Sequence, residues 1–307
     1  RIWDSRGRPT VEVDIITESG ALGRGIAPAG ASRGTREAIE RRDGGTRFGG
    51  LDVMQAVQGI QTEIAPTLLG LDVTAQEQID TLLIALDGTP DKSRLGGNAL
   101  IATSLAVLHA AAADAQLPLW RYLAKDTVVQ LPLPQIQIFG GGAHADRRVD
   151  IQDFMVIAVG ARSFAHAMEM TAEVYRHAGL LMKQRGSSQG IADEGGWWPA
   201  FAHNEEALDV LVMSIEAAGF VPGQDVSIAL DIAASEFGHD GRYTLGLEKK
   251  ELDSDGLIEK LLKWLDKYPI VSIEDPVAEA LGPPAVQFLV RTGGHGLRGR
   301  GAGHGRQ

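Results

Sequence analysis

The 307-residue sequence contains no cysteine. This absence excludes disulfide bonds, thiolate zinc sites and cysteine nucleophiles, so any metal ion must be held by oxygen or imidazole ligands. The uncharged run at residues 99–113 is too short and too rich in small residues to span a bilayer, and we expect a buried helix there. Acidic residues outnumber basic ones, 40 to 29, and the resulting formal net charge of −11 argues against a nucleic-acid-binding surface.

The last 28 residues, 280–307, contain no aspartate, glutamate or lysine, whereas they hold eight glycines and four arginines. The run GHGLRG at 294–299 matches a dinucleotide-binding pattern, but that fingerprint requires a following helix and a second strand, for which no residues remain. We therefore expect residues 280–307 to be an unrelated tail. A reading frame shifted after about residue 279 would explain its composition.

The sequence as a whole has the composition of a folded globular protein, with 44% hydrophobic and 22% charged residues. Alternation of apolar and polar residues on both sides of Ser19 and Gly20 predicts an antiparallel hairpin. Helical patterns follow at 36–43, 53–70 and 75–88 and from Asn98 onward. Residues 1–130 are thus predicted to form a small domain of strands and helices.

From Leu131 onward, short apolar strands alternate with amphipathic helices. Strands are predicted within 153–160, 190–196, 225–233 and 269–276, and helices at about 163–183, 204–218 and 254–267. This alternation indicates an α/β domain with a parallel sheet, either closed into a barrel or doubly wound, over residues 131–279.

Two of these strands end in a carboxylate, Asp231 in SIALD and Glu274 in IVSIE. In a βα barrel the carboxyl ends of the strands form one rim, where the two side chains would converge. Hard oxygen ligands at such a rim suit Mg²⁺. The alternative for either residue alone is a helix cap in a loop.

Other candidate residues lie in loops. Glu194 belongs to IADEGG, in which paired acids beside glycines suit either acid–base chemistry or an ordinary turn. His144 lies in a glycine-rich loop before Gln152 and Asp153; such a histidine can bind metal, transfer protons or bind anions, but most loop histidines do none of these. The small-residue loop around Ser32 is either a lid or a flexible connection.

Eight motifs, taken in order, resemble the enolase family of phosphopyruvate hydratases. They are DSRGRPTVEV, AGASRG, ALDGTPDKSRLGGNA, GGAHAD, DIQDFM, DEGG, ALDIAASEF and YPIVSIEDP. The resemblance implies an α/β fold, with a small N-terminal α+β cap domain followed by a (β/α)8-type barrel that is incomplete here. It also implies Mg²⁺-dependent, reversible dehydration of 2-phosphoglycerate to phosphoenolpyruvate in glycolysis.

Carried over motif by motif, the resemblance implies a role for each candidate. Asp231 and Glu274 would be two of three carboxylates that hold the first Mg²⁺, and Ser32 would bring the lid to a second. Glu194 would protonate the departing hydroxyl. The remaining candidates, His144, Gln152 and Asp153, would contact the substrate or position the acid. The family also suggests a homodimer or octamer in the cytoplasm, although its members occur at cell surfaces as well.

The sequence also departs from the family pattern. Phe139 replaces an amide in the glycine-rich motif, Asp153 is one methylene shorter than glutamate, and Trp198 stands where a small residue is expected. After Pro276 no counterpart is found for the third metal carboxylate, the proton-abstracting lysine, the phosphate-binding arginine and serine, or a second lysine. We therefore expect a chain impaired or inactive in catalysis. The alternatives are a non-catalytic remnant acting as a binding or surface protein, a product without function, or a barrel enzyme with an altered substrate.

Overall fold

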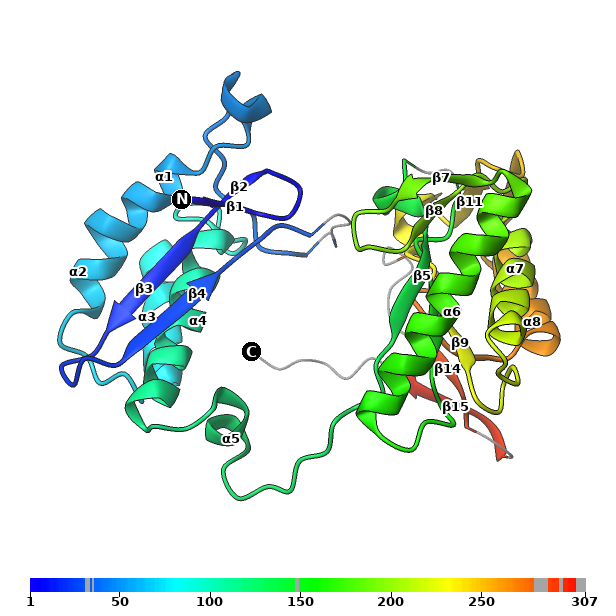
Figure 1. Ribbon diagram of the computed structural model, residues 1–307. Coiled ribbons are helices and arrows are strands. Elements are labelled where there is room, and N and C mark those ends of the chain that lie inside the picture. The colour runs from blue at the N-terminus through cyan, green and yellow to red at the C-terminus, as the bar shows by residue number, and fades with distance from the viewer. Residues whose placement is uncertain (31–33, 35, 147–148, 279–286, 293–294, 302–307) are drawn as a thin grey trace. The chain divides into compact units, whose positions relative to one another are not determined.

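The computed structural model describes residues 1–30, 34, 36–146, 149–278, 287–292 and 295–301 (Figure 1). Of His144 and of residues 287–292 and 295–301 it describes the backbone alone. The chain divides into two compact units, Arg1–Gln130 and Leu131–Gln307. Across the described ranges, no helix combines the length and the apolar character needed to cross a bilayer.

The first unit packs helices against a β-hairpin. Its strands are β1 (Ile2–Trp3), β2 (Pro9–Thr10), β3 (Glu12–Ile16) and β4 (Leu22–Ile26), and its helices are η1 (Arg47–Gly50), α1 (Met54–Gly59), η2 (Ile60–Ile64), α2 (Ala65–Leu68), α3 (Gln76–Asp87), α4 (Gly97–Asp114) and α5 (Leu119–Ala124). The predicted hairpin is confirmed, because β3 and β4 pair antiparallel from Glu12↔Ile26 to Ile16↔Leu22.

The strand β4 lies directly on the backbone of α4. A Cβ atom at Gly23 or Gly25 would overlap main-chain atoms of Ala102, Ala106 and Ala110, and these three alanines are fully buried. Glycine on the strand and alanine on the helix therefore permit an approach that larger side chains would prevent.

The helix predicted at 53–70 forms as three consecutive segments, α1, η2 and α2. The central segment, η2, has the wider π-helical winding, and Pro66 follows it in the first turn of α2. Since proline has no N–H group and its ring crowds the preceding turn, the change in winding just before it has a local cause.

The predicted helix at 36–43 is wrong, because this segment is irregular. Its backbone groups bond to residues distant in sequence: Ile39 N donates to Asp91 O at 2.7 Å, and Gly97 N donates to Ile39 O at 2.8 Å. Arg41 N likewise donates to Asn98 Oδ1 at 3.0 Å. These tertiary bonds replace the bonds within a helix that the local sequence favours.

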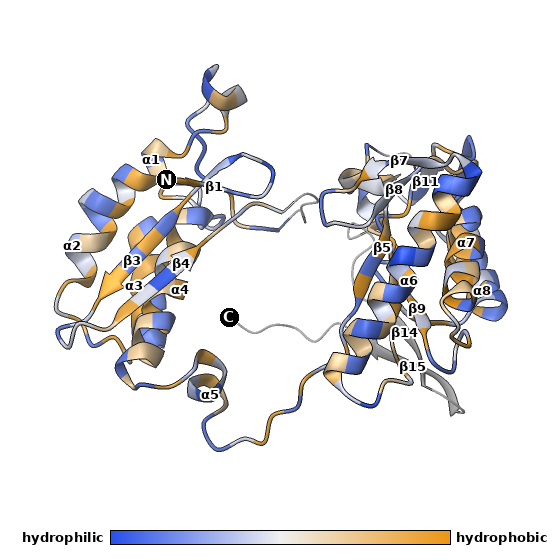
Figure 2. Ribbon diagram, viewed as in Figure 1, coloured by the Kyte–Doolittle hydropathy of each residue, from blue (hydrophilic) through white to orange (hydrophobic). Residues whose placement is uncertain are grey.

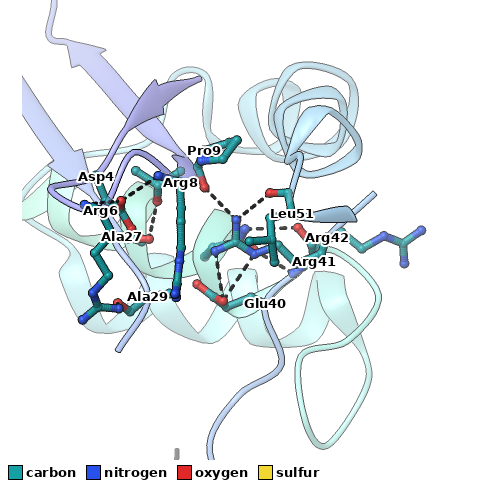
Figure 3. A network of polar contacts seen from close by, with 12 residues as sticks. Asp4, Arg6, Arg8, Pro9, Ala27, Ala29, Glu40, Arg41, Arg42 and Leu51 are labelled. Atoms are coloured by element: carbon teal, nitrogen blue, oxygen red, sulfur yellow. Dashed lines mark hydrogen bonds and ion pairs between the residues drawn. The ribbon is translucent and has the colours of Figure 1, made fainter. Parts of the chain in front are cut away.

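Arg42 fixes this irregular segment to its neighbours (Figure 3). Its Nη1 donates to Pro9 O at 2.6 Å and to Leu51 O at 2.8 Å, and its Nη2 pairs with Glu40 at 3.1 Å. The Arg42 side chain is only 15% exposed. One planar guanidinium thus joins three segments of the unit.

The second unit contains a six-stranded sheet. The described strands of the whole unit are β5 (Ile136–Gly140), β6 (Asp153–Ile157), β7 (Ser188–Ile191), β8 (Trp197–Pro199), β9 (Ser227–Asp231), β10 (Gly238–His239), β11 (Arg242–Leu245), β12 (Lys250–Asp253), β13 (Ile270–Glu274), β14 (Gln287–Thr292) and β15 (His295–Gly301). Its helices are η3 (Gly142–His144), α6 (Phe164–Arg185), α7 (Asn204–Ala217), η4 (Ala234–Glu236) and α8 (Ser254–Lys267). The main sheet has the order β13-β9-β6-β5-β8-β7.

Three amphipathic helices pack against this sheet: α6 contacts β5 and β6, α7 contacts β6, and α8 contacts β13 (Figure 1). Hydrophobic and hydrophilic residues alternate along each of these helices (Figure 2). On α6 the buried face includes Met170, Val174 and Met182, spaced by one or two helical turns. The helices therefore bury one face against the strands, as their sequence periodicity predicts.

The strand directions partly correct the sequence prediction. The pairs β9–β13 and β5–β8 are parallel, as expected, whereas β6 runs antiparallel to both β5 and β9. In the described part of the connection from β5 to β6, residues 141–146 and 149–152, the one helical segment is the short η3. A chain without a helical crossover can return antiparallel.

Among the described strands, β14 and β15 pair with each other alone, in a separate antiparallel sheet. The interpretation of residues 280–307 as an unrelated tail stays a prediction.

Candidate active site

Three acidic residues lie on one edge of the main sheet. Asp231 ends β9 and Glu274 ends β13, and the two are register partners. Asp153 begins β6 and is the register partner of Asp231 on the other side. Because β6 is antiparallel to β9, its first residue reaches the edge where β9 and β13 end. We call Asp153, Asp231 and Glu274 the acidic edge.

Burial, together with repulsion between the carboxyl groups of the acidic edge, raises the pKa of two of them. Burial raises the pKa of Asp231 to about 7, with the charges of Glu274 and Asp153 adding to the rise, while a hydrogen bond from Ala233 N opposes it. Partial burial of its carboxyl group also raises the pKa of Glu274, followed by the charges of Asp275 and Asp153. Such crowding of carboxylates favours a bound cation or a shared proton.

Gln152 extends the set of oxygen atoms at this edge. Its Nε2 donates to Asp231 Oδ2 at 3.0 Å. Its Oε1 is buried without a hydrogen-bond partner among the described residues. A buried acceptor left without a partner in this way is costly unless a ligand completes it.

The donor set fits a magnesium ion in part. The described residues contain no group of three or more acidic, histidine or cysteine side chains arranged to hold a metal. Asp231, Glu274 and the Gln152 carbonyl would instead supply a few hard oxygens. Mg²⁺ commonly binds to proteins through one or two carboxylates and keeps water or substrate oxygens as its other ligands.

Glu194 lies in the loop between β7 and β8, and Gln137 of β5 connects this loop to the acidic edge. Gln137 Nε2 donates to Asp153 Oδ1, and also to Glu194 Oε2 at 3.4 Å. Gln137 Oε1 accepts a 2.9 Å hydrogen bond from Gly196 N. Sequence reasoning missed Gln137, because no periodicity or motif marks one amide in a strand as part of a site.

The remaining candidates are placed less completely. His144 ends η3, directly after the carboxyl end of β5, and the structure describes its backbone position only. Ser32, the lid residue expected to reach a second Mg²⁺, lies outside the described residues. Their roles stay predictions.

Two of the departures from the family pattern have described structural positions. Phe139 is fully buried in the hydrophobic core and packs edge-on against Phe201, with ring centroids 5.4 Å apart. Trp198 lies in β8, opposite Gly190 of β7. The amide that reaches the acidic edge from β5 is therefore that of Gln137, and Phe139 contributes to packing.

The second unit is a mixed α/β domain, in which helices pack against a sheet with parallel strand pairs, as in part of a barrel. The family model of the enolase N-terminal domain matches residues 1–123, and that of the enolase C-terminal TIM barrel domain matches residues 128–283. The chain therefore belongs to the enolase family, and the predicted α/β fold, a cap domain followed by part of a barrel, is confirmed.

Individual relatives agree with this assignment. Enolase 1 of Desulfitobacterium hafniense (strain Y51) is 50% identical over 282 residues, which cover 91% of this chain and 64% of that protein. An enolase of Acidothermus cellulolyticus is 49% identical over 278 residues, which cover 91% of this chain and 64% of that protein. The chain thus spans less than two thirds of the length of these relatives.

Proposed function

We propose that the acidic edge serves the enolase reaction, the reversible Mg²⁺-dependent dehydration of 2-phosphoglycerate to phosphoenolpyruvate. The observation that carries this proposal is the placement of Asp153, Asp231 and Glu274 on adjacent strand ends, with raised pKa values at Asp231 and Glu274. Membership of the enolase family supports it.

In this proposal Asp231 and Glu274 would hold a magnesium ion, and Ser32 would be a ligand of a second one. Bound Mg²⁺ would supply the positive charge that a doubly charged enediolate needs. Glu194 donates a proton to the departing hydroxyl group. Substrate contacts fall to His144, Gln152 and Asp153, of which Gln152 and Asp153 are 5% and 6% exposed and so provide a largely dry wall.

We further propose that a polypeptide of these 307 residues turns over slowly or not at all. The last lysine is Lys267, before β13, and residues 268–307 contain none. Removing the proton beside the substrate carboxylate requires a base, and general-base catalysis contributes roughly 10²- to 10⁴-fold to a rate. In this proposal, no residue of the acidic edge acts as the base that removes this proton.

Calorimetric titration with MgCl₂, followed by phosphoenolpyruvate, tests the binding function separately from turnover. We expect Mg²⁺ to bind the wild-type chain, and Asp231→Asn and Glu274→Gln each to weaken it by about tenfold or more. Exposed Asp266→Asn, on α8, is the matched control. Unchanged Mg²⁺ affinity in both edge variants would contradict the proposal.

Turnover is measured as phosphoenolpyruvate formed from 2-phosphoglycerate by the purified chain, free of host enolase. A robust rate that disappears in Glu194→Gln would overturn the proposed impairment while supporting the role of Glu194. Binding without turnover is the expected result.

A chain that binds neither Mg²⁺ nor phosphoenolpyruvate is a remnant without the enolase site. Cytoplasmic location and assembly as a homodimer or octamer are part of the same proposal.

A further inference from the structure

The side chain of Gln137, a residue of β5, is buried against the loop that carries Glu194. It is 8% exposed. A Cβ atom at either Gly140 or Gly196 would collide with the Gln137 amide or with atoms beside it. The amide therefore occupies space that two glycines leave free.

The two ends of this amide have different partners. The oxygen accepts from Gly196 N, which lies two residues after Glu194, and the nitrogen donates to Asp153 and Glu194. Since a backbone N–H can only donate, the bond from Gly196 fixes which end of the amide faces Gly196. Both N–H groups of Gln137 are thereby directed at carboxylate oxygens.

The loop itself is tightly turned. Ala192 N donates to Gly196 O at 2.7 Å, and Gly195 N donates to Ala192 O at 3.0 Å. Tyr175 of α6 also contacts the loop, and its Oη donates to Gly195 O at 2.8 Å. Gln137 joins this preformed turn to the first residue of β6, and so to the acidic edge.

We propose that Gln137 is a positioning residue for Glu194: its oxygen holds the loop, and its nitrogen orients the Glu194 carboxylate toward Asp153. The catalytic significance of this role rests on the proposed function of Glu194. The geometric part of the proposal does not, and each part has its own measurement.

Two substitutions separate the two ends of the amide. Gln137→Leu removes both interactions and leaves Gly196 N–H buried without an acceptor. Gln137→Glu keeps an oxygen for Gly196 N but replaces the donor facing Asp153 and Glu194 with a third acidic group. Exposed Gln135→Leu, two residues earlier, is the matched control.

Three readouts are compared in these variants of the full 307-residue chain. The first is the hydrogen-exchange rate of the Gly196 amide, which we expect to rise about tenfold in Gln137→Leu, less than threefold in Gln137→Glu, and not in the control. The second is the ¹³C shift of the Glu194 side-chain carboxyl, which should change in both Gln137 variants. The third is phosphoenolpyruvate affinity with Mg²⁺, which should fall about tenfold in both.

The outcomes distinguish the two proposals. An unchanged Gly196 exchange rate in Gln137→Leu, or an unchanged Glu194 carboxyl signal in both variants, would overturn the positioning role. If Gln137→Leu does not fold, Gln137→Glu decides through the carboxyl signal alone. If the wild-type chain binds no phosphoenolpyruvate, the proposed function fails, and the first two readouts still decide the geometry.

Discussion

Asp231 and Glu274 are register partners at the carboxyl ends of two parallel strands, and both carboxyl groups have pKa values above their ordinary range. Asp153 adds a third acid on the opposite side of Asp231. A sheet edge arranged in this way is unfavourable in the metal-free protein, because like charges lie together in a partly buried site. This cost is consistent with an edge shaped for a cation.

Asp231→Asn is therefore expected to stabilise the metal-free protein while it weakens Mg²⁺ binding. At pH 8, in the presence of EDTA, we expect the free energy of unfolding to rise by about 1 to 2 kcal/mol. The asparagine oxygen can still accept from Ala233 N, and its NH₂ group can donate to the Gln152 oxygen once that amide turns. Urea denaturation measures the gain.

The control for this prediction is Asp266→Asn, which removes one negative charge from the exposed face of α8. Its unfolding free energy should stay close to that of the wild type, because isolated surface charges contribute little. A loss of stability in Asp231→Asn would mean that the carboxylate is needed for folding and would contradict the crowding argument.

The sequence pattern predicts the positions of two of the three residues of the acidic edge, but not of the third, nor that of Gln137 beside it. Asp231 and Glu274 end apolar runs, so that strand pattern alone placed them at strand ends. Asp153 reaches the same edge for a reason the pattern does not contain, since β6 is antiparallel to β9. The position of Gln137 depends on tertiary structure, because its partners lie 16, 57 and 59 residues away along the chain.

The misassigned segment at 36–43 has the same physical origin. Its residues favour a helix locally, but its backbone groups find partners at Asp91, Gly97 and Asn98. Local propensity amounts to less than about 1 kcal/mol for each residue, and a set of satisfied tertiary hydrogen bonds can exceed it. The long helices α4, α6, α7 and α8 were predictable because their propensity and their packing agree.

Gly25→Ala should strongly destabilise the first unit. A methyl group at this position would overlap backbone atoms of Ala102 and Ala106 in α4, which cannot move aside as a side chain could. We expect a loss of about 2 to 3 kcal/mol in the free energy of unfolding, the upper range for overpacking. Thermal unfolding followed by circular dichroism detects it.

The neighbouring substitution Arg24→Ala is the control for that experiment. Arg24 is exposed on the same strand and pairs with Asp14 at 2.7 Å. Loss of an exposed ion pair should change the melting temperature little. Equal shifts for Gly25→Ala and Arg24→Ala would show that the close approach of β4 to α4 is not what limits stability.

Arg42→Lys should also destabilise the first unit, although it preserves the charge. The guanidinium bonds to Pro9 O, Leu51 O and Glu40 at once, and a lysine ammonium cannot reach all three from one position. We expect a loss of about 1 to 2 kcal/mol, measured by urea denaturation. Exposed Arg36→Lys, in the same irregular segment, should have little effect, and a similar loss there would refute the bridging role.

Glu248→Gln should reveal an acid-sensitive ion pair in the second unit. Burial raises the pKa of Glu248, but hydrogen bonding and attraction to Lys260, with a hydrogen bond from Asn204, outweigh it and hold the pKa below its ordinary value. Lys260 Nζ lies 2.9 and 2.8 Å from the two carboxylate oxygens. The pair joins the β11–β12 turn to α8, and at pH 7 its loss should cost about 1 kcal/mol.

The pH dependence has a definite sign. A carboxyl whose pKa is depressed in the folded state stabilises the protein above its unfolded-state pKa, near 4.3, and this contribution disappears as the pH falls through the lower folded-state value. The stability difference between wild type and Glu248→Gln should therefore be constant from pH 7 to about 5 and then shrink toward pH 3. Glu259→Gln, which removes an exposed pair with Lys263 on α8, should show a smaller difference throughout. A difference that widens on acidification would mean that Glu248 is protonated more readily in the folded protein, contrary to its contacts with Lys260.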